Sequence, residues 1–136
     1  QIFAATSAND TDWMVRLSDV SPDGRASFLA EGVMRARHRD PEQGGAFNAH
    51  QLSQIEADKV YPYLIEFWRP TGNRFLAGHR IRVEISSSYY PYYLRNLNTG
   101  EDNIGLAVHP VVATQRIRHD AAHPSHIVLP IIPAGK

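Results

Sequence analysis

The spacing of apolar side chains predicts that most of this chain forms β-strands. His79–Ser88 shows the clearest alternation, because branched apolar residues alternate there with charged ones. Trp13–Val20 alternates in the same way, with its large apolar residues on one face. A period of two turns one face of a strand to the core and the other to water. We therefore predict that both segments are half-buried strands of an antiparallel sheet.

Further strands are predicted where short apolar runs are bounded by turn residues. They cover Gln1–Ala8, Ala26–Ala30, Gly32–Arg39, Val60–Trp68, Val111–His119 and His126–Ile132. Ser21–Gly24 joins two strands as a tight hairpin turn, since Pro22 presets φ and Gly24 accepts positive φ. Pro62 places the start of its strand at a sheet edge or a bulge, because proline cannot donate to a ladder.

Two connections are too long for hairpins. Asp40–Asp58 contains a proline and two glycines, and we expect a surface loop with a helical turn near Leu52–Ala57. Tyr89–His109 is rich in aromatic residues, Asn and Gly, and is also predicted to be a loop. About eight short strands with almost no helix, joined partly by long crossings, indicate an all-β sandwich of the Greek-key or jelly-roll type. The 136 residues fit a single domain over residues 1–136.

Composition argues against several classes of partner. The 14 basic residues balance the 14 acidic ones, so no net field favours nucleic acid, a membrane surface or an acidic substrate. The chain has no cysteine, which removes disulfides, thiolate metal sites and thiol catalysis. It contains no run of about eighteen apolar residues that would span a membrane. Its first residues lie in a predicted strand, and we expect the chain to be a piece of a larger protein.

No catalytic residue is predicted within this chain. A serine hydrolase of the α/β type needs its nucleophile in a G-x-S-x-G turn, and that pattern does not occur. Ser86, Ser87 and Ser88 end a strand without flanking glycines, so we expect their hydroxyls to bond nearby backbone groups. We likewise predict no cofactor.

The histidines near the C-terminus have the residue types of a zinc site. His119, His123 and His126 lie four and three residues apart, with Asp120 beside them. That spacing suits a helix, whereas Pro124 and the β-like run after it favour a turn. We therefore predict a polar turn that leads into the last strand, and no metal site.

Two further charged groups carry weaker alternatives. Asp10 and Asp12 share one strand face, and such a pair can divide acid and base roles or help to hold calcium. Nothing marks an apolar pocket around them, so capping of backbone amides is favoured. Arg35, Arg37 and Arg39 share the face of another predicted strand. A solvated face is favoured there over contact with an acidic partner surface.

Four tyrosines form the most unusual surface candidate. They are Tyr89, Tyr90, Tyr92 and Tyr93, with Pro91 between the pairs. Four such residues on one loop cannot all pack inward, and exposed aromatic side chains line partner interfaces or stack on sugars. Two alternatives have equal weight. The tyrosines pack on a separate domain or line its cleft, or the loop folds over the end of the sandwich. Independent sugar binding is a third.

Three stretches of the chain carry a family resemblance. They are Ser7–Trp13 with Arg16–Ala26, Asn73–Ser88 with Arg95–Gly100, and His123–Pro133. In this order and spacing they resemble the C-terminal domain of the cocaine esterase, α-amino acid ester hydrolase and X-Pro dipeptidyl-peptidase group. The resemblance covers nearly the whole chain. One departure is Ala77, where the family usually has proline in the turn Leu-Pro-Gly-His.

The resemblance implies a fold and a role. The fold is a jelly-roll β-sandwich that resembles carbohydrate-binding modules of the galactose-binding-like type. The role is that of a non-catalytic domain that follows an α/β-hydrolase domain with a Ser-Asp-His triad. The expected partner is that catalytic domain of the same parent chain, on which this domain packs and whose substrate cleft it helps to shape. A homo-oligomer stays open, a stand-alone carbohydrate-binding module is the alternative function, and an independent enzyme ranks last.

Overall fold

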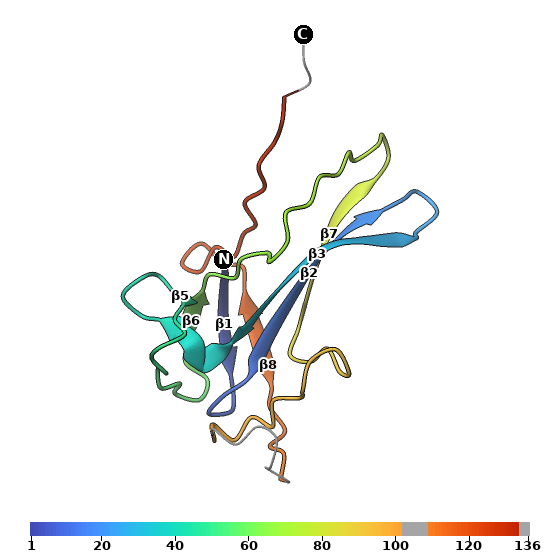
Figure 1. Cartoon of the computed structure of the whole chain (residues 1–136). Helices are drawn as coiled ribbons and strands as arrows, with labels where there is room; N and C mark the ends of the chain where they lie inside the picture. Colours follow the sequence, from blue (N-terminus) through green and yellow to red (C-terminus); the bar gives the residue numbers. More distant parts are fainter. Residues whose placement is uncertain (102–108, 134–136) are drawn as a thin grey trace.

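The structure, a computed structural model that describes residues 1–101 and 109–133, has antiparallel strands as nearly all of its regular secondary structure (Figure 1). One sheet has β2 (Asp12–Val20) at its centre, between β3 (Ala26–Arg35) and β7 (Arg80–Ser86). The other sheet has β1 (Ile2–Thr6) at its centre, between β6 (Tyr61–Tyr63) and β8 (Gln115–Arg118). The predicted all-β sandwich is therefore confirmed.

Smaller elements lie beside the two main sheets. β4 (Arg39–Asp40) and β5 (Ala46–Phe47) pair as a short third sheet, which lies within the predicted long connection. A 3-10 turn, η1 (Ala36–His38), follows β3 and is the one helical segment in the described ranges. Within those ranges, no helix has the length and apolar character needed to cross a membrane.

The predicted hairpin joins β2 to β3. Ser21 accepts a hydrogen bond on its carbonyl from the Gly24 amide at 2.9 Å, and Gly24 has φ of +89°. The ladder then runs from Val20 opposite Ala26 to Asp12 opposite Arg35, with a register shift between Leu17 and Ser18. The two predicted strands around Gly32 thus form one strand as far as Arg35. The 3-10 turn replaces Ala36–His38, and Arg39 begins β4.

The core lies between the sheets at one end of the molecule. Trp13 from β2 and Tyr63 from β6 are fully buried, and their ring centroids lie 5.5 Å apart. Around them pack Ile2, Ala4, Met34, Ala36, Ile55 and Tyr61. Burial of one large side chain is worth about 2–3 kcal/mol, so this cluster holds the sheets together. The apolar face predicted for Trp13–Val20 is confirmed, but the prediction of a half-buried strand is wrong, because Met14 and Ser18 on the other face are also buried.

Three predicted strands are wrong in extent or in existence. Val60–Trp68 forms a ladder only over Tyr61–Tyr63, and Val111–His119 only over Gln115–Arg118. His126–Ile132 forms no strand. A strand needs a neighbour for its backbone groups, and within the described part of the chain these segments have none along most of their length.

The two long connections also differ from simple loops. The helical turn predicted near Leu52–Ala57 does not form, because the segment is held extended by bonds to other elements. Ser53 N donates to Arg37 O and Asp58 N donates to Thr6 O, each at 2.7 Å. The described part of Tyr89–His109 is a loop as predicted, and residues 102–108 lie outside the described ranges.

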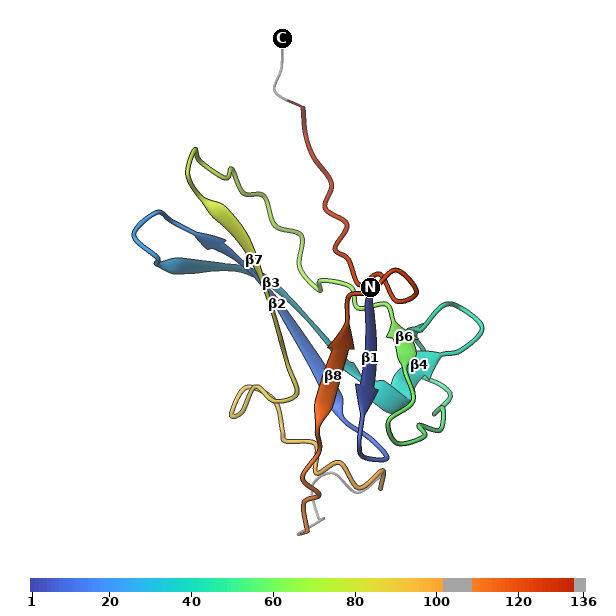
Figure 2. The ribbon, with the colours of Figure 1, turned by 180° about the vertical axis from the view of Figure 1, so that it is seen from behind.

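The sandwich is open at the end opposite the core. Figures 1 and 2 show the two sheets diverging, with the C-terminal segment leaving between them. Ile81 and Val83 lie on the β7 face that was predicted to be core, yet they are 52% and 40% exposed. The predicted strand is confirmed, but the prediction that this face is core is wrong, because nothing within the described residues fully covers the inner face of β7.

Candidate functional site

The tyrosine loop, defined here as Tyr89–Leu94, folds over the outer face of the β3-β2-β7 sheet. The Arg16 guanidinium lies 4.6 Å from the centroid of the Tyr89 ring and 5.6 Å from that of Phe28. Tyr89 also stacks on Tyr92 at 4.9 Å between ring centroids. The Tyr93 hydroxyl donates to Glu31 Oε1 at 3.2 Å. Partial burial and the nearby Glu31 carboxylate raise the pKa of Tyr93 above its ordinary value.

The four tyrosines divide into two pairs. Tyr89 and Tyr93 are half-buried against the sheet, whereas Tyr90 and Tyr92 are 66% and 77% exposed. Leu94 is 68% exposed beside them. The loop thus presents apolar and aromatic groups to the outside from a base anchored on β2 and β3. The sequence groups all four residues together, but only the contacts of Tyr89 with Arg16 and of Tyr93 with Glu31 reveal which two face outward.

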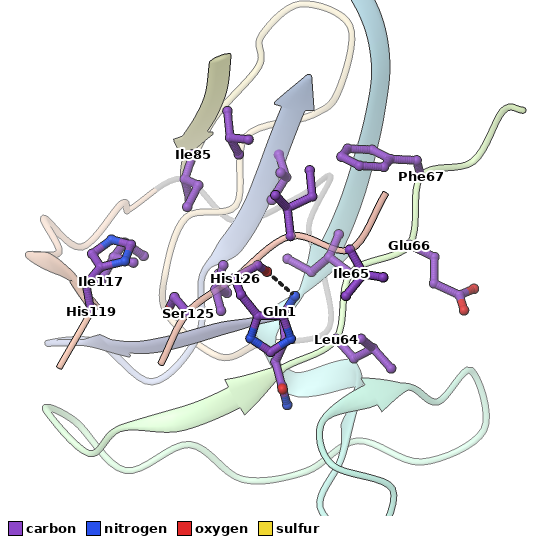
Figure 3. A pocket seen from close by; sticks show the side chains of 15 residues that line it. Gln1, Leu64, Ile65, Glu66, Phe67, Ile85, Ile117, His119, Ser125 and His126 are labelled. Carbon is purple, nitrogen blue, oxygen red and sulfur yellow. Dashed lines mark hydrogen bonds between the residues drawn. The ribbon is translucent and has the colours of Figure 1, made fainter. Parts of the chain in front are cut away.

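An apolar groove of about 810 Å³ lies between the diverging sheets (Figure 3). β2 and β7 supply one wall, with Val15, Val83 and Ile85. The opposite side consists of residues 64–67 and the C-terminal residues 125–128, with Gln1 between them. Sequence reasoning missed this groove. The signal that could have found it is the presence of strand-like segments without an assigned partner.

A second, smaller hollow of about 630 Å³ lies along β3. Phe47, Leu64 and Trp68 line it and are 61%, 40% and 63% exposed. The Trp68 amide donates to Glu31 O at 3.1 Å, which holds this segment against β3. The two hollows share residues 64–67, so apolar surface continues around this side of the molecule.

Asp10 and Asp12 belong to a buried polar cluster, and the capping prediction for them is wrong. Asp10 is fully buried and pairs through Oδ2 with the Arg35 guanidinium. Asn96 Nδ2 donates to Asp10 Oδ2 at 3.2 Å and to Asp12 Oδ1 at 2.9 Å. Burial raises the pKa of Asp12 to about 6, and the neighbouring Asp10 adds to the effect. The cluster ties the loop after β7 to the start of β2.

The arginine prediction is also wrong, because the three arginines do not share a solvated face. Arg37 and Arg39 are 8% and 6% exposed, since the 3-10 turn ends the alternation of β3. Each of the three bonds a carbonyl of a loop: Arg35 binds Glu101 O, Arg37 binds Gly100 O and Arg39 binds Gln54 O. Arg39 also lies 3.9 Å from the Tyr61 ring centroid. These arginines fix loops in place.

The histidine segment forms the predicted polar turn. Asp120 Oδ1 accepts bonds from the amides of Ala122 and His123 at 3.0 and 2.9 Å. His126 Nδ1 contacts Pro124 O at 2.8 Å, and no cluster of three or more metal-ligating side chains occurs within residues 1–101 and 109–133. The serine prediction is confirmed for Ser86, whose hydroxyl donates to the nearby Ser88 carbonyl at 3.1 Å.

These features define a class of domain. It is an antiparallel β-sandwich with apolar surface left open on two sides. In the described residues, no histidine forms a hydrogen bond with a serine hydroxyl. Such a domain suits an accessory role beside another folded body, because isolated domains rarely leave large apolar patches in water.

Comparison with known proteins identifies the family. The family model for the X-Pro dipeptidyl-peptidase C-terminal non-catalytic domain matches residues 1–128. Cocaine esterase from Rhodococcus sp. (strain MB1 Bresler) is 42% identical over 133 residues, which are 97% of this chain and 22% of that protein. The chain belongs to this C-terminal non-catalytic domain family, whose parent proteins are hydrolases.

Solved structures agree with this assignment. An aminopeptidase from the marine sediment archaeon Thaumarchaeota archaeon superposes with a TM-score of 0.78 and 34% identity, covering 90% of this chain and 21% of that one. An α-amino acid ester hydrolase superposes with a TM-score of 0.73 and 29% identity, covering 85% of this chain and 19% of that one. The chain thus spans about a fifth of the length of its relatives and corresponds to the C-terminal domain of a larger hydrolase chain.

Proposed function

We propose that this domain packs, through the tyrosine loop, on the α/β-hydrolase catalytic domain of its parent chain and helps to shape the entrance to that domain's substrate cleft. The observation that carries the proposal is the exposure of Tyr90, Tyr92 and Leu94 on a loop whose base is anchored by Tyr89 and Tyr93. Aromatic groups that are already held in place lose little entropy on binding and are frequent at interface centres.

The parent is proposed to be a serine hydrolase that cleaves an ester or an amide through an acyl-serine intermediate. The support is the kinship with cocaine esterase and with an α-amino acid ester hydrolase. A nucleophile, a base that activates it and an oxyanion hole are then supplied by the catalytic domain. This domain contributes shape and orientation, which alter the rate for large substrates more than that for small ones.

The stand-alone carbohydrate-binding module is the competing function. It needs a flat aromatic platform with polar neighbours, and it does not require the open apolar surface along β3 and between the sheets. Trp68 and Phe47 are more than half exposed, which favours packing against another folded body. Pull-down with a panel of insoluble polysaccharides separates the two, since an interaction domain is not retained by any of them.

The test of the packing proposal replaces Tyr90 and Tyr92 with serine in the full-length hydrolase. Loss of a contact worth about 1 kcal/mol changes an equilibrium about fivefold. We expect kcat/KM for a bulky aromatic ester to fall by about that factor, with little change for a small acetate ester, and the thermal midpoint to decrease. Val112→Ser is the matched control, because Val112 is 95% exposed on a different segment. If the double variant behaves like the control in both assays, the tyrosine loop does not contact the catalytic domain.

A further inference from the structure

The loop Asn96–Glu101 is bonded to two acidic side chains at the start of β2. Asn96 Nδ2 donates to Asp10 Oδ2 at 3.2 Å and to Asp12 Oδ1 at 2.9 Å, so one amide group bridges both carboxylates. Asp10 is fully buried and Asp12 is half-buried, which is rare for acidic side chains unless they are paired. The hydration of Asp12 therefore depends on whether this loop is in place.

Two arginines hold the far end of the same loop. Arg35 donates to Glu101 O at 2.8 Å and also pairs with the Asp10 carboxylate. Arg37 donates to Gly100 O. The loop and the two carboxylates thus belong to one hydrogen-bonded network, because Arg35 contacts both. A change of charge in the carboxylate pair can therefore reach the loop directly.

The remaining bonds of the loop are made between neutral groups. The Asn98 amide donates to Asn96 Oδ1 at 2.9 Å, which folds the loop on itself. The Val111 amide donates to Leu97 O at 2.9 Å, and Asn98 Nδ2 donates to Val111 O at the same distance. These bonds do not titrate, so they hold the loop equally at every pH near neutrality.

Burial raises the pKa of Asp12 to about 6. The titratable or charged groups of the described residues that face it are Asp10, Arg35 and His38. Asp10 adds to the rise, whereas the bond from Asn96 and the charges of Arg35 and His38 oppose it. If the loop lifts, water returns to Asp12 and the main cause of the rise is removed. The closed loop thus binds this proton more tightly than the open loop, and its advantage is lost as the pH rises through about 6.

We propose that the Asp10–Asp12 pair is a pH-sensitive latch for the loop Asn96–Glu101. The loop is held more firmly while Asp12 is protonated, and it opens more often once Asp12 carries a charge beside Asp10. Because Asn96 follows the tyrosine loop by two residues, the latch also sets how firmly the end of that loop is anchored. The latch lies within this domain, so it goes beyond the packing proposal and does not depend on it.

Hydrogen exchange of single amides in the full-length hydrolase, measured from pH 5 to pH 8, tests the latch. The Asn98 and Val111 amides report opening, and the Asp58 amide, which donates to Thr6 O at 2.7 Å, is the reference. Each rate is divided by the intrinsic rate of the unfolded peptide at the same pH. A pKa of 3.8 in the open loop and about 6 in the closed loop gives about tenfold more opening at pH 8 than at pH 5. Allowing for contact with water, we expect the protection of the two loop amides to fall about three- to tenfold, and that of Asp58 to change less than about twofold.

Asp12→Asn keeps an acceptor for Asn96 but cannot gain a charge, so its loop amides should be equally protected at pH 5 and pH 8. Asp23→Asn is the matched control, because Asp23 is exposed in the turn at the other end of β2, and it should keep the pH response. A response that persists in Asp12→Asn overturns the latch, since His38 or another group then titrates. A response of equal size at Asp58 also overturns it, because the whole domain then unfolds, as does constant protection in the unmodified protein. None of these outcomes decides whether the tyrosine loop contacts the catalytic domain.

Discussion

Replacing Asp12 with asparagine should stabilise this domain at neutral pH, although it removes a charged residue that bonds to Asn96. Asn96 donates to Asp12 Oδ1 at 2.9 Å, and an asparagine carbonyl can accept the same bond. What the variant removes is the cost of holding a carboxylate in a partly buried site next to the carboxylate of Asp10. Burial is the main reason that the pKa of Asp12 rises from 3.8 to about 6.

The magnitude follows from the linkage between protonation and folding. One pKa unit corresponds to about 1.4 kcal/mol, so the unscreened cost at neutral pH is about 3 kcal/mol. Because the Asp12 side chain keeps some contact with water, we expect about 1–2 kcal/mol. The folded state binds this proton more tightly than the unfolded state. The contribution of Asp12 to the free energy of unfolding therefore decreases as the pH rises from about 4 to about 6. Above that range it does not decrease further.

Urea unfolding of the domain and of Asp12→Asn between pH 4 and pH 8, followed through the buried Trp13, measures this difference. The variant should match the parent sequence near pH 4 and exceed its stability from pH 6 upward. Asp23→Asn is a control of opposite sign, because bonds from Ser21 and from the Arg25 amide lower the pKa of Asp23. That control should lose stability at neutral pH, and its deficit should shrink as pH falls below about 4. An Asp12→Asn variant that is less stable at pH 7, or whose stability difference is constant from pH 4 to pH 8, would refute the reasoning.

Two further substitutions test the loops and the buried ion pair. Gly45→Ala should destabilise the domain by more than about 2 kcal/mol in urea unfolding, because φ is +87° and an added Cβ would lie 2.1 Å from Pro62 O. Gly44→Ala should cost only about 1 kcal/mol, since its φ is +64° but no atom lies within 4 Å of the added Cβ; equal losses would contradict the steric account. Arg35→Met should cost about 3–5 kcal/mol by leaving the Asp10 carboxylate buried without its cation. Adding Asp10→Asn should recover part of that loss, and a double-mutant cycle without coupling would show that the pair is not an energetic unit.

Part of the candidate site was predictable because it depends on local pattern. The tyrosine loop stands out in the sequence, and its position after the β7 strand follows from alternation that ends at Ser86. Its division into an anchored pair and an exposed pair was not predictable. That division depends on Arg16 and Glu31, which lie opposite each other across the β2–β3 ladder and come from a distant part of the chain. The burial of Arg37 and Arg39 was missed because it depends on loops that fold back on them, with the carbonyls of Gly100 and Gln54 as their partners.

The sequence by itself determined the strands β2 and β7, the apolar face of β2, the hairpin turn at Gly24 and, by resemblance, the family to which the chain belongs. The strands, the apolar face and the turn depend on residues that are close in the sequence, because a period of two and a turn signal need no information from elsewhere. Only the tertiary structure decided which segments became strands. Residues 64–68 and 126–132 have strand-like side chains, but the backbone bonds of Leu64, Trp68 and His126 are isolated, and no continuous ladder forms within the described part of the chain. Strand formation depends on a neighbour, and a neighbour is a property of the whole fold.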